Sequence, residues 1–158
     1  MSQFKNVIPE TTPLRYLSGL AALNIPSENG TGDWHMVETF MKPKTESARL
    51  FVAGVGCADD TTPLLSSEGV FDCSKVLDRF KIPHPKGAVF AANHARAIAD
   101  MVIVTVLGGG SPNFIALDDW MPGVDDKGAV FSMLQLVFEK IEKTDKESIV
   151  QWITKNSN

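Results

Sequence analysis

A stripe of polar side chains in an otherwise apolar segment is the first place where this sequence could do chemistry. Asn93, Arg96 and Asp100 recur at helical spacing within residues 88–107, so a helix places them on one face. Arg96 and Asp100 can form an internal ion pair that orients the helix, which we favour. Alternatively, the three residues line a binding pocket, because a guanidinium suits carboxylate and phosphate groups.

Two histidines are the candidate general acid and base. His94 lies beside the polar stripe, and His35 follows Asp33 and Trp34. Imidazole titrates near neutral pH, and Asp33 could orient His35. Adjacent residues on a helix do not face each other, however. A helix cap for Asp33 and a core or interface anchor for Trp34 are therefore the structural alternatives, and we favour them over catalysis.

Motifs for metal, nucleotide or nucleophilic chemistry are incomplete in this sequence. The histidines lack both HExxH spacing and the cysteine partners of a zinc site. Gly54-Val55-Gly56 lacks the third glycine of a dinucleotide loop, and no serine has a GxSxG context. Pairs of aspartates fall in expected loops, where Asp favours turns and caps. We therefore expect no metal and no cofactor.

Composition limits the class of protein. With 158 residues, 44% of them hydrophobic, the chain is expected to form one globular domain over 1–158 without disulfide support. The formal net charge is -4 and the basic residues are scattered, which argues against direct nucleic-acid binding. Two cysteines without a CxxC pair fit a reducing cytoplasm. Neither a signal peptide nor a membrane span is expected.

The elements that would position these residues are mostly helices. The sequence predicts a mainly α (α+β) fold, a compact bundle of about six helices with a small β element. The central apolar helix is expected at 88–107, and its end could be a strand over 101–107 because β-branched residues gather there. We favour a helix continuing to Gly108, since no turn residue intervenes. The other helices are expected at 12–24, 33–42, 72–82, 130–141 and 144–154, and a buried strand at 50–55.

Two features mark the ends of the predicted helices. Thr12 followed by Pro13 is typical of a helix start. Thr144 and Glu147 have the spacing of a capping box for the last helix. Both interpretations use side-chain hydroxyls to satisfy backbone N–H groups that lack helical partners.

A resemblance is carried by the run Tyr16-Leu17-Ser18-Gly19-Leu20-Ala21-Ala22-Leu23-Asn24-Ile25-Pro26 followed by Gly32-Asp33-Trp34-His35. This segment resembles the opening of small uncharacterised bacterial proteins encoded in toxin–antitoxin or mobile-element operons. The resemblance implies a neutralising or accessory role toward a partner protein, such as a toxin encoded nearby, and assigns no site residues.

These observations lead to three hypotheses for function. The first is a protein-interaction module, such as an antitoxin or immunity protein that neutralises a partner enzyme, since an acidic surface suits a basic partner. The second is a small enzyme with His35 or His94 as general base and Arg96 binding an anionic substrate. The third is a small-molecule-binding regulator. The sequence leaves the oligomeric state open.

Overall fold

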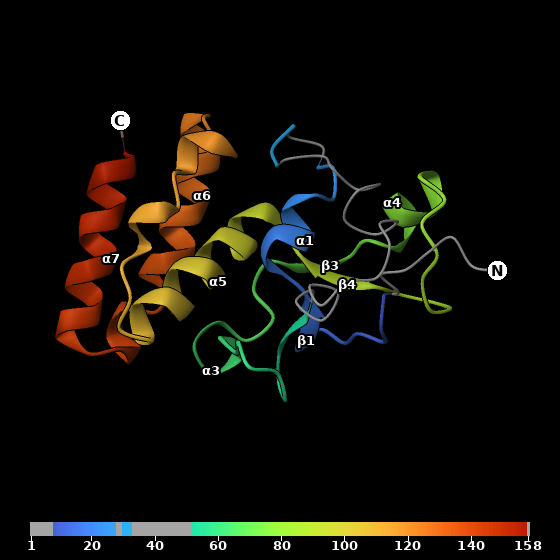
Figure 1. Ribbon diagram of the computed structural model, residues 1–158, viewed down its shortest axis with the longest axis horizontal. Helices are drawn as coiled ribbons and strands as arrows, with labels where there is room; N and C mark the ends of the chain where they lie inside the picture. The colour runs from blue at the N-terminus through green and yellow to red at the C-terminus, as the bar shows by residue number, and fades with distance from the viewer. Residues whose placement is uncertain (1–7, 28–29, 33–51, 158) are drawn as a thin grey trace.

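The computed structural model describes residues 8–27, 30–32 and 52–157 as helices around a small sheet (Figure 1). The α+β class is therefore confirmed. The strands are β1 (Arg15–Leu17), β2 (Val52–Gly54), β3 (Val70–Asp72) and β4 (Phe90–Ala92). The α-helices are α1 (Gly19–Leu23), α3 (Thr62–Leu65), α4 (Ser74–Arg79), α5 (His94–Leu107), α6 (Val124–Gln135) and α7 (Lys143–Asn156). Short 3-10 helices are η2 (Pro112–Phe114), η3 (Leu117–Asp119) and η4 (Phe138–Lys140).

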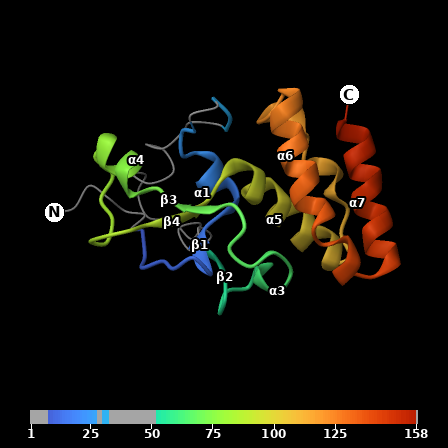
Figure 2. The same cartoon turned by 180° about the vertical axis from the view of Figure 1, so that it is seen from behind.

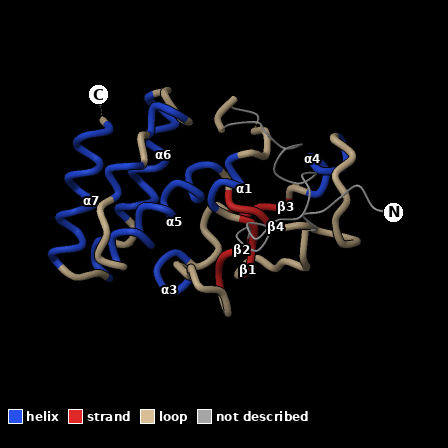
Figure 3. The backbone as a smooth tube through the Cα atoms, in the orientation of Figure 1, coloured by secondary structure: helices blue, strands red, loops and turns tan. Residues whose placement is uncertain are grey.

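The sheet is mixed and has the strand order β2-β1-β4-β3. β1 pairs antiparallel with β2 and parallel with β4, where Leu17 lies opposite Ala91. β3 completes the sheet by pairing antiparallel with β4. Figure 3 shows the four strands together in the middle of the molecule. β1, which is close to the start of the described chain, is thus an inner strand.

The two faces of the sheet belong to two hydrophobic cores. Because side chains alternate along a strand, Tyr16 and Ala92 join a core with α5, whereas Leu17 and Ala91 join a second core. Leu77 of α4 packs into this second core. Figures 1 and 2 both place α4 on the opposite side of the sheet from α6 and α7.

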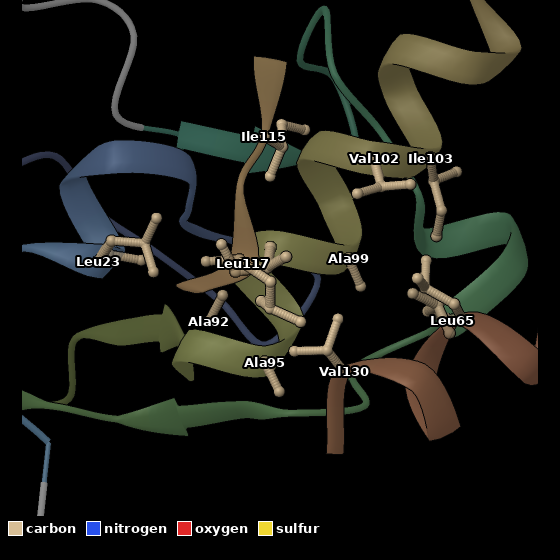
Figure 4. Close-up of a cluster of buried hydrophobic side chains, with 14 of the residues drawn as sticks. Leu23, Leu65, Ala92, Ala95, Ala99, Val102, Ile103, Ile115, Leu117 and Val130 are labelled. Carbon is tan, nitrogen blue, oxygen red and sulfur yellow. The ribbon is translucent and has the colours of Figure 1, made fainter. Parts of the chain in front are cut away.

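The larger core includes many side chains of α5. Ala99 and Val102 are completely buried in it, and Figure 4 shows Ala99 on the side of α5 toward Val130 of α6. Trp152 of α7 is also buried there, and its indole N–H donates a hydrogen bond of 3.0 Å to the carbonyl of Ile115. These contacts hold α6 and α7 against the side of α5 that faces away from α4 (Figure 2).

The helix predicted at 12–24 is wrong over its first half. Arg15–Leu17 is strand β1, because it finds backbone partners on two sides. Thr12 caps a tight turn instead of a helix: its backbone bonds to that of Arg15, and its hydroxyl accepts the N–H of Leu14. The helix begins only at Gly19, whose φ of 61° is readily adopted by glycine. Tertiary pairing here outweighs a favourable local start signal.

The segment 88–107 divides into a strand and a helix. Phe90–Ala92 is β4, so the prediction of helix from residue 88 is wrong there. Asn93 ends the strand and caps α5, which continues to Leu107. The helical alternative for 101–107 is thus confirmed, with Gly108 as the C-cap. Within the described ranges, no helix is long and apolar enough to cross a membrane.

The other predicted elements differ mainly at their ends. β2 confirms the strand expected at 50–55 over Val52–Gly54, whereas Val55 already belongs to the following turn. The helix expected at 130–141 begins earlier, at Val124, and is interrupted after Gln135. The capping box of Thr144 is wrong, because α7 already includes Lys143 and its N-cap is Glu142. The helix expected at 33–42 lies outside the described residues.

Candidate functional site

Arg96 is the centre of a buried polar network. Its side chain is completely buried, and its Nε donates to Asp100 Oδ1 at 2.8 Å. The predicted internal ion pair is therefore confirmed. The terminal nitrogens donate to Tyr16 Oη at 2.8 Å, to Thr61 Oγ1 at 3.0 Å and to the carbonyl of Glu68. Every nitrogen of the guanidinium thus has a partner within the protein.

Asp100 is equally occupied. Its Oδ1 accepts from Arg96 and from the Thr61 hydroxyl, the latter at 2.6 Å. Its Oδ2 accepts from Tyr16 Oη at 2.7 Å and from Ser18 Oγ at 2.9 Å. A carboxylate offers about four lone-pair sites, so these four donors fill it.

Tyr16 acts as a neutral donor in this network. Burial, together with the negative charge of Asp100 and the hydrogen bond to it, raises the pKa of the Tyr16 phenol well above its usual range. The phenol therefore keeps its proton and donates it to Asp100. The guanidinium carbon of Arg96 also lies 5.1 Å from the centre of the Tyr16 ring, close enough for a cation–π contact.

The network joins segments that are distant in sequence. Tyr16 comes from β1, Ser18 from the residue before α1, and Thr61 from the residue before α3, whereas Arg96 and Asp100 lie on α5. Sequence reasoning found the pair on α5 because helical spacing is local. It missed the three hydroxyl residues, and the only signal for them was the general need of a buried ion pair for further polar partners.

Asn93 has a structural role at the start of α5. Its Oδ1 accepts the backbone N–H of Arg96 at 2.8 Å, which is the geometry of an N-cap. Its own N–H donates to the carbonyl of Gly69 at 2.6 Å. Asn93 thus fixes the helix that carries Arg96 and does not bond to the guanidinium or carboxylate through any contact of the described chain.

His94 belongs to a second buried cluster. Its Nε2 lies 2.7 Å from the carbonyl of Ile25, so Nε2 carries the proton and donates it. Nδ1 then accepts from the Thr31 hydroxyl, which itself lies 2.8 Å from Ser27 Oγ. Burial lowers the pKa of His94. This neutral chain shares no hydrogen bond with the Arg96 network among the described residues.

Three of the candidate residues cannot be placed beside these clusters. Asp33, Trp34 and His35 lie outside the described residues, so their proposed roles as orienting carboxylate, binding residue and general base remain predictions.

A pocket of about 180 Å³ lies beside the Arg96 network. We name it the Phe114 pocket, after the aromatic side chain that lines it and is 68% exposed. Ser18 and Asp100 are the buried polar residues that line it. Asp59 also lines the pocket and is exposed to solvent. The remaining lining residues are Gly19, Val52, Ala53, Met101, Val104 and Thr105.

Other chemistry finds little support in the described part of the chain. Burial raises the pKa of the Cys73 thiol to about 12, so this thiol stays protonated and is a poor nucleophile near neutral pH. In the described ranges, no three side chains of His, Cys, Asp or Glu lie close enough to hold a metal ion together.

No family model, curated protein or solved structure matches this chain. Its function is therefore inferred from the geometry of the Phe114 pocket and of the two buried clusters.

Proposed function

We propose that this chain is a protein-interaction module of the bacterial cytoplasm, of the antitoxin or immunity type, which neutralises a basic partner enzyme. The observation that carries the proposal is that a largely exposed aromatic side chain, Phe114, and an exposed carboxylate, Asp59, line one pocket. Exposed aromatic residues around a recess are typical anchors of protein interfaces. The formal charge of -4 favours encounter with a basic surface.

Two exposed apolar residues are close in sequence to residues that line the pocket. Leu20 follows the lining residue Gly19 and is 59% exposed. Leu107 is one helical turn beyond Val104 on α5 and is 46% exposed. These exposed side chains support the proposal, because the centre of a protein interface is rich in apolar surface.

The alternative of a small enzyme has less support from these contacts. To bind an anionic substrate, Arg96 would have to release Asp100, and separating a buried ion pair costs about 3–5 kcal/mol. To act as general base, His94 would have to exchange its bond with Thr31 for one with substrate, although only 6% of the residue is exposed.

Helices α5, α6 and α7 are the proposed scaffold of the interface. We include in the proposal the helix bundle around a central apolar helix, with α6 and α7 packed on α5. Its support is that Val104 and Met101 of α5 line the pocket while Val102 and Ile103 of the same helix are buried in the larger core. A pocket built on such a helix keeps its shape when a partner binds.

The direct test is complex formation with the product of the adjacent gene. The two proteins are co-expressed, toxicity is measured, and the complex is examined by size-exclusion chromatography and titration calorimetry. We expect a stoichiometric complex that relieves toxicity. Phe114→Ala should weaken it by about tenfold or more, as truncation of an aromatic anchor does. Phe80→Ala is the matched control, because Phe80 is 44% exposed but follows α4, across the sheet from α6 and α7.

Unchanged toxicity with no complex would overturn the proposal. A complex that withstands Phe114→Ala but not Phe80→Ala would place the interface on the α4 side of the molecule and would contradict the assignment to the Phe114 pocket.

A further inference from the structure

The hydroxyl of Ser18 is a hydrogen-bond acceptor with a fixed orientation. Its hydrogen is directed to Asp100 Oδ2, 2.9 Å away. The hydroxyls of Tyr16 and Thr61 also donate to Asp100, but each of them in turn accepts an N–H from Arg96. Within the described part of the chain, no donor reaches Ser18 Oγ. Its lone pairs therefore have no donor among the described residues, and Ser18 lines the Phe114 pocket although only 5% of the residue is exposed.

The described lining of the pocket carries a net negative charge. Asp100 is neutralised by its ion pair with Arg96. Asp59, by contrast, makes no side-chain hydrogen bond or ion pair within the described ranges, and the described lining residues include no Lys or Arg. A ligand that donates hydrogen bonds and carries a positive charge would satisfy both Ser18 Oγ and Asp59.

The rest of the lining suits methylene groups. Val52, Met101, Val104 and Phe114 supply apolar surface within the same pocket. Long cationic side chains bury their aliphatic stems along such surface while the charged end stays with polar groups. At roughly 30 Å³ per heavy atom, the volume that a water molecule occupies in the liquid, a butylammonium group fits into the 180 Å³ available.

We propose that the Phe114 pocket binds an alkylammonium group, namely a lysine side chain of the basic partner protein. The methylenes lie between Val104 and Phe114, and the ammonium donates to Ser18 Oγ and to the Asp59 carboxylate. The protein source of this lysine rests on the function proposed above. The preference of the pocket for alkylammonium rests only on its own geometry.

The first test uses n-pentylammonium as probe and 1-pentanol as its neutral counterpart. Both are titrated into the whole, uniformly ¹⁵N-labelled protein, and amide shifts are followed by NMR. We expect saturable shifts at Gly19, Ala53 and Val104, and binding of the alcohol at least about tenfold weaker, because hydrogen bonds to a charged group are the stronger ones. Equal binding of the two probes, shifts confined to other surfaces, or no binding would overturn the proposal.

Single-residue variants distinguish the contribution of the Asp59 charge from that of the pocket shape to binding of the probes. Asp59→Asn should weaken pentylammonium binding by about fivefold, the value of a partly exposed ion pair, and leave pentanol binding unchanged. Glu139→Gln removes one negative charge from an exposed position away from the pocket and should leave both unchanged. Thr105→Met fills the pocket with a good helix former and should weaken both probes by about tenfold. Asp59→Asn without effect on pentylammonium would contradict the role of this carboxylate.

The outcomes distinguish this inference from the proposed function. If pentylammonium binds as expected but no partner complex forms, the pocket chemistry stands and its protein source is wrong. If a complex forms and withstands both Asp59→Asn and Thr105→Met, the interaction module stands and the lysine inference is overturned. If n-butylguanidinium binds more tightly than n-pentylammonium, the pocket prefers an arginine side chain. That result would contradict the assignment to lysine.

Discussion

Two buried polar clusters include residues from the first turns of α5, and they differ in charge. The Arg96 network contains a full ion pair, and hydroxyls from distant segments surround it. The His94 cluster carries no charge and consists of a chain from Ser27 through Thr31 to the imidazole. A buried charge without partners is far more costly than a buried neutral group without one. We therefore expect the Arg96 network to dominate stability and the His94 cluster to dominate its pH dependence.

Removing Arg96 should have the largest effect. Arg96→Met leaves Asp100 buried without its cationic partner, so the free energy of unfolding should fall by about 3–5 kcal/mol. Urea denaturation monitored by circular dichroism measures this loss. Arg96→Met combined with Asp100→Leu should recover much of it, because no unpaired charge remains. A single variant as stable as the parent would show that this ion pair does not support the fold.

Loss of one hydroxyl from the same network should have a smaller effect. Thr61→Val removes a donor from Asp100 and an acceptor from Arg96, which should lower the free energy of unfolding by about 1–3 kcal/mol. The adjacent Thr62 is a matched control, because among the described residues its hydroxyl bonds only to the exposed Asp60. Thr62→Val should change stability by less than about 0.5 kcal/mol. If the two variants lower the free energy of unfolding equally, the buried network contributes no more to stability than an exposed hydrogen bond.

The helix cap that precedes both clusters should contribute still less. Asn93→Ala removes the acceptor for the N–H of Arg96 and should cost about 1 kcal/mol. Asn93→Asp keeps an acceptor at this position and should retain most of the stability. Thermal unfolding of the two variants side by side measures the difference, and an alanine variant that matches the aspartate variant would contradict capping.

The His94 cluster should be visible in the pH dependence of stability. Burial lowers the pKa of His94 below that of the unfolded chain, about 6.5. As the pH falls below 6.5, the unfolded state therefore binds more protons than the folded state, and the free energy of unfolding decreases; above 6.5 this contribution is fully present. Urea midpoints between pH 5 and 8 measure the slope, which His94→Gln should reduce.

His84 also contributes to the pH dependence of stability, so it is best replaced before the effect of His94 is measured. Burial lowers its pKa, but hydrogen bonds to Asp78 and to the Pro85 carbonyl outweigh this and leave the pKa raised. Its contribution is thus present below the unfolded pKa and is lost as the pH rises, opposite in sign to that of His94. The His94 experiment is best made with His84→Gln in both proteins. An unchanged slope after His94→Gln would then contradict the assignment of the acid sensitivity to His94.

The sequence was informative where interactions are local. Arg96 and Asp100 are partners within one helix, so their spacing predicted the ion pair. Gly108 correctly marked the end of α5. Tyr16, Ser18 and Thr61 could not be found in this way, because their positions beside Asp100 depend on how strands and loops are arranged in three dimensions.

The two misassigned segments share a physical cause. Residues of β1 and β4 were expected to be helical because their helix start signal or alanine content favours helix. They pair with each other in the sheet, and such pairing overrides local propensity. By contrast, the apolar run at β2 was recognised as a strand because it is short and bounded by glycine.

The position of β1 inside the sheet has a consequence for biosynthesis. Tyr16 and Asp100 are 84 residues apart in the chain, and Leu17 meets Ala91 of β4 in the same part of the structure. A ribosome therefore releases β1 long before its parallel neighbour exists. Contacts of such long sequence separation are closed late and slowly, whereas helices with nearby partners form early. The α5–α7 region can thus assemble as soon as it is made, while the Arg96 network is completed only when β1 docks.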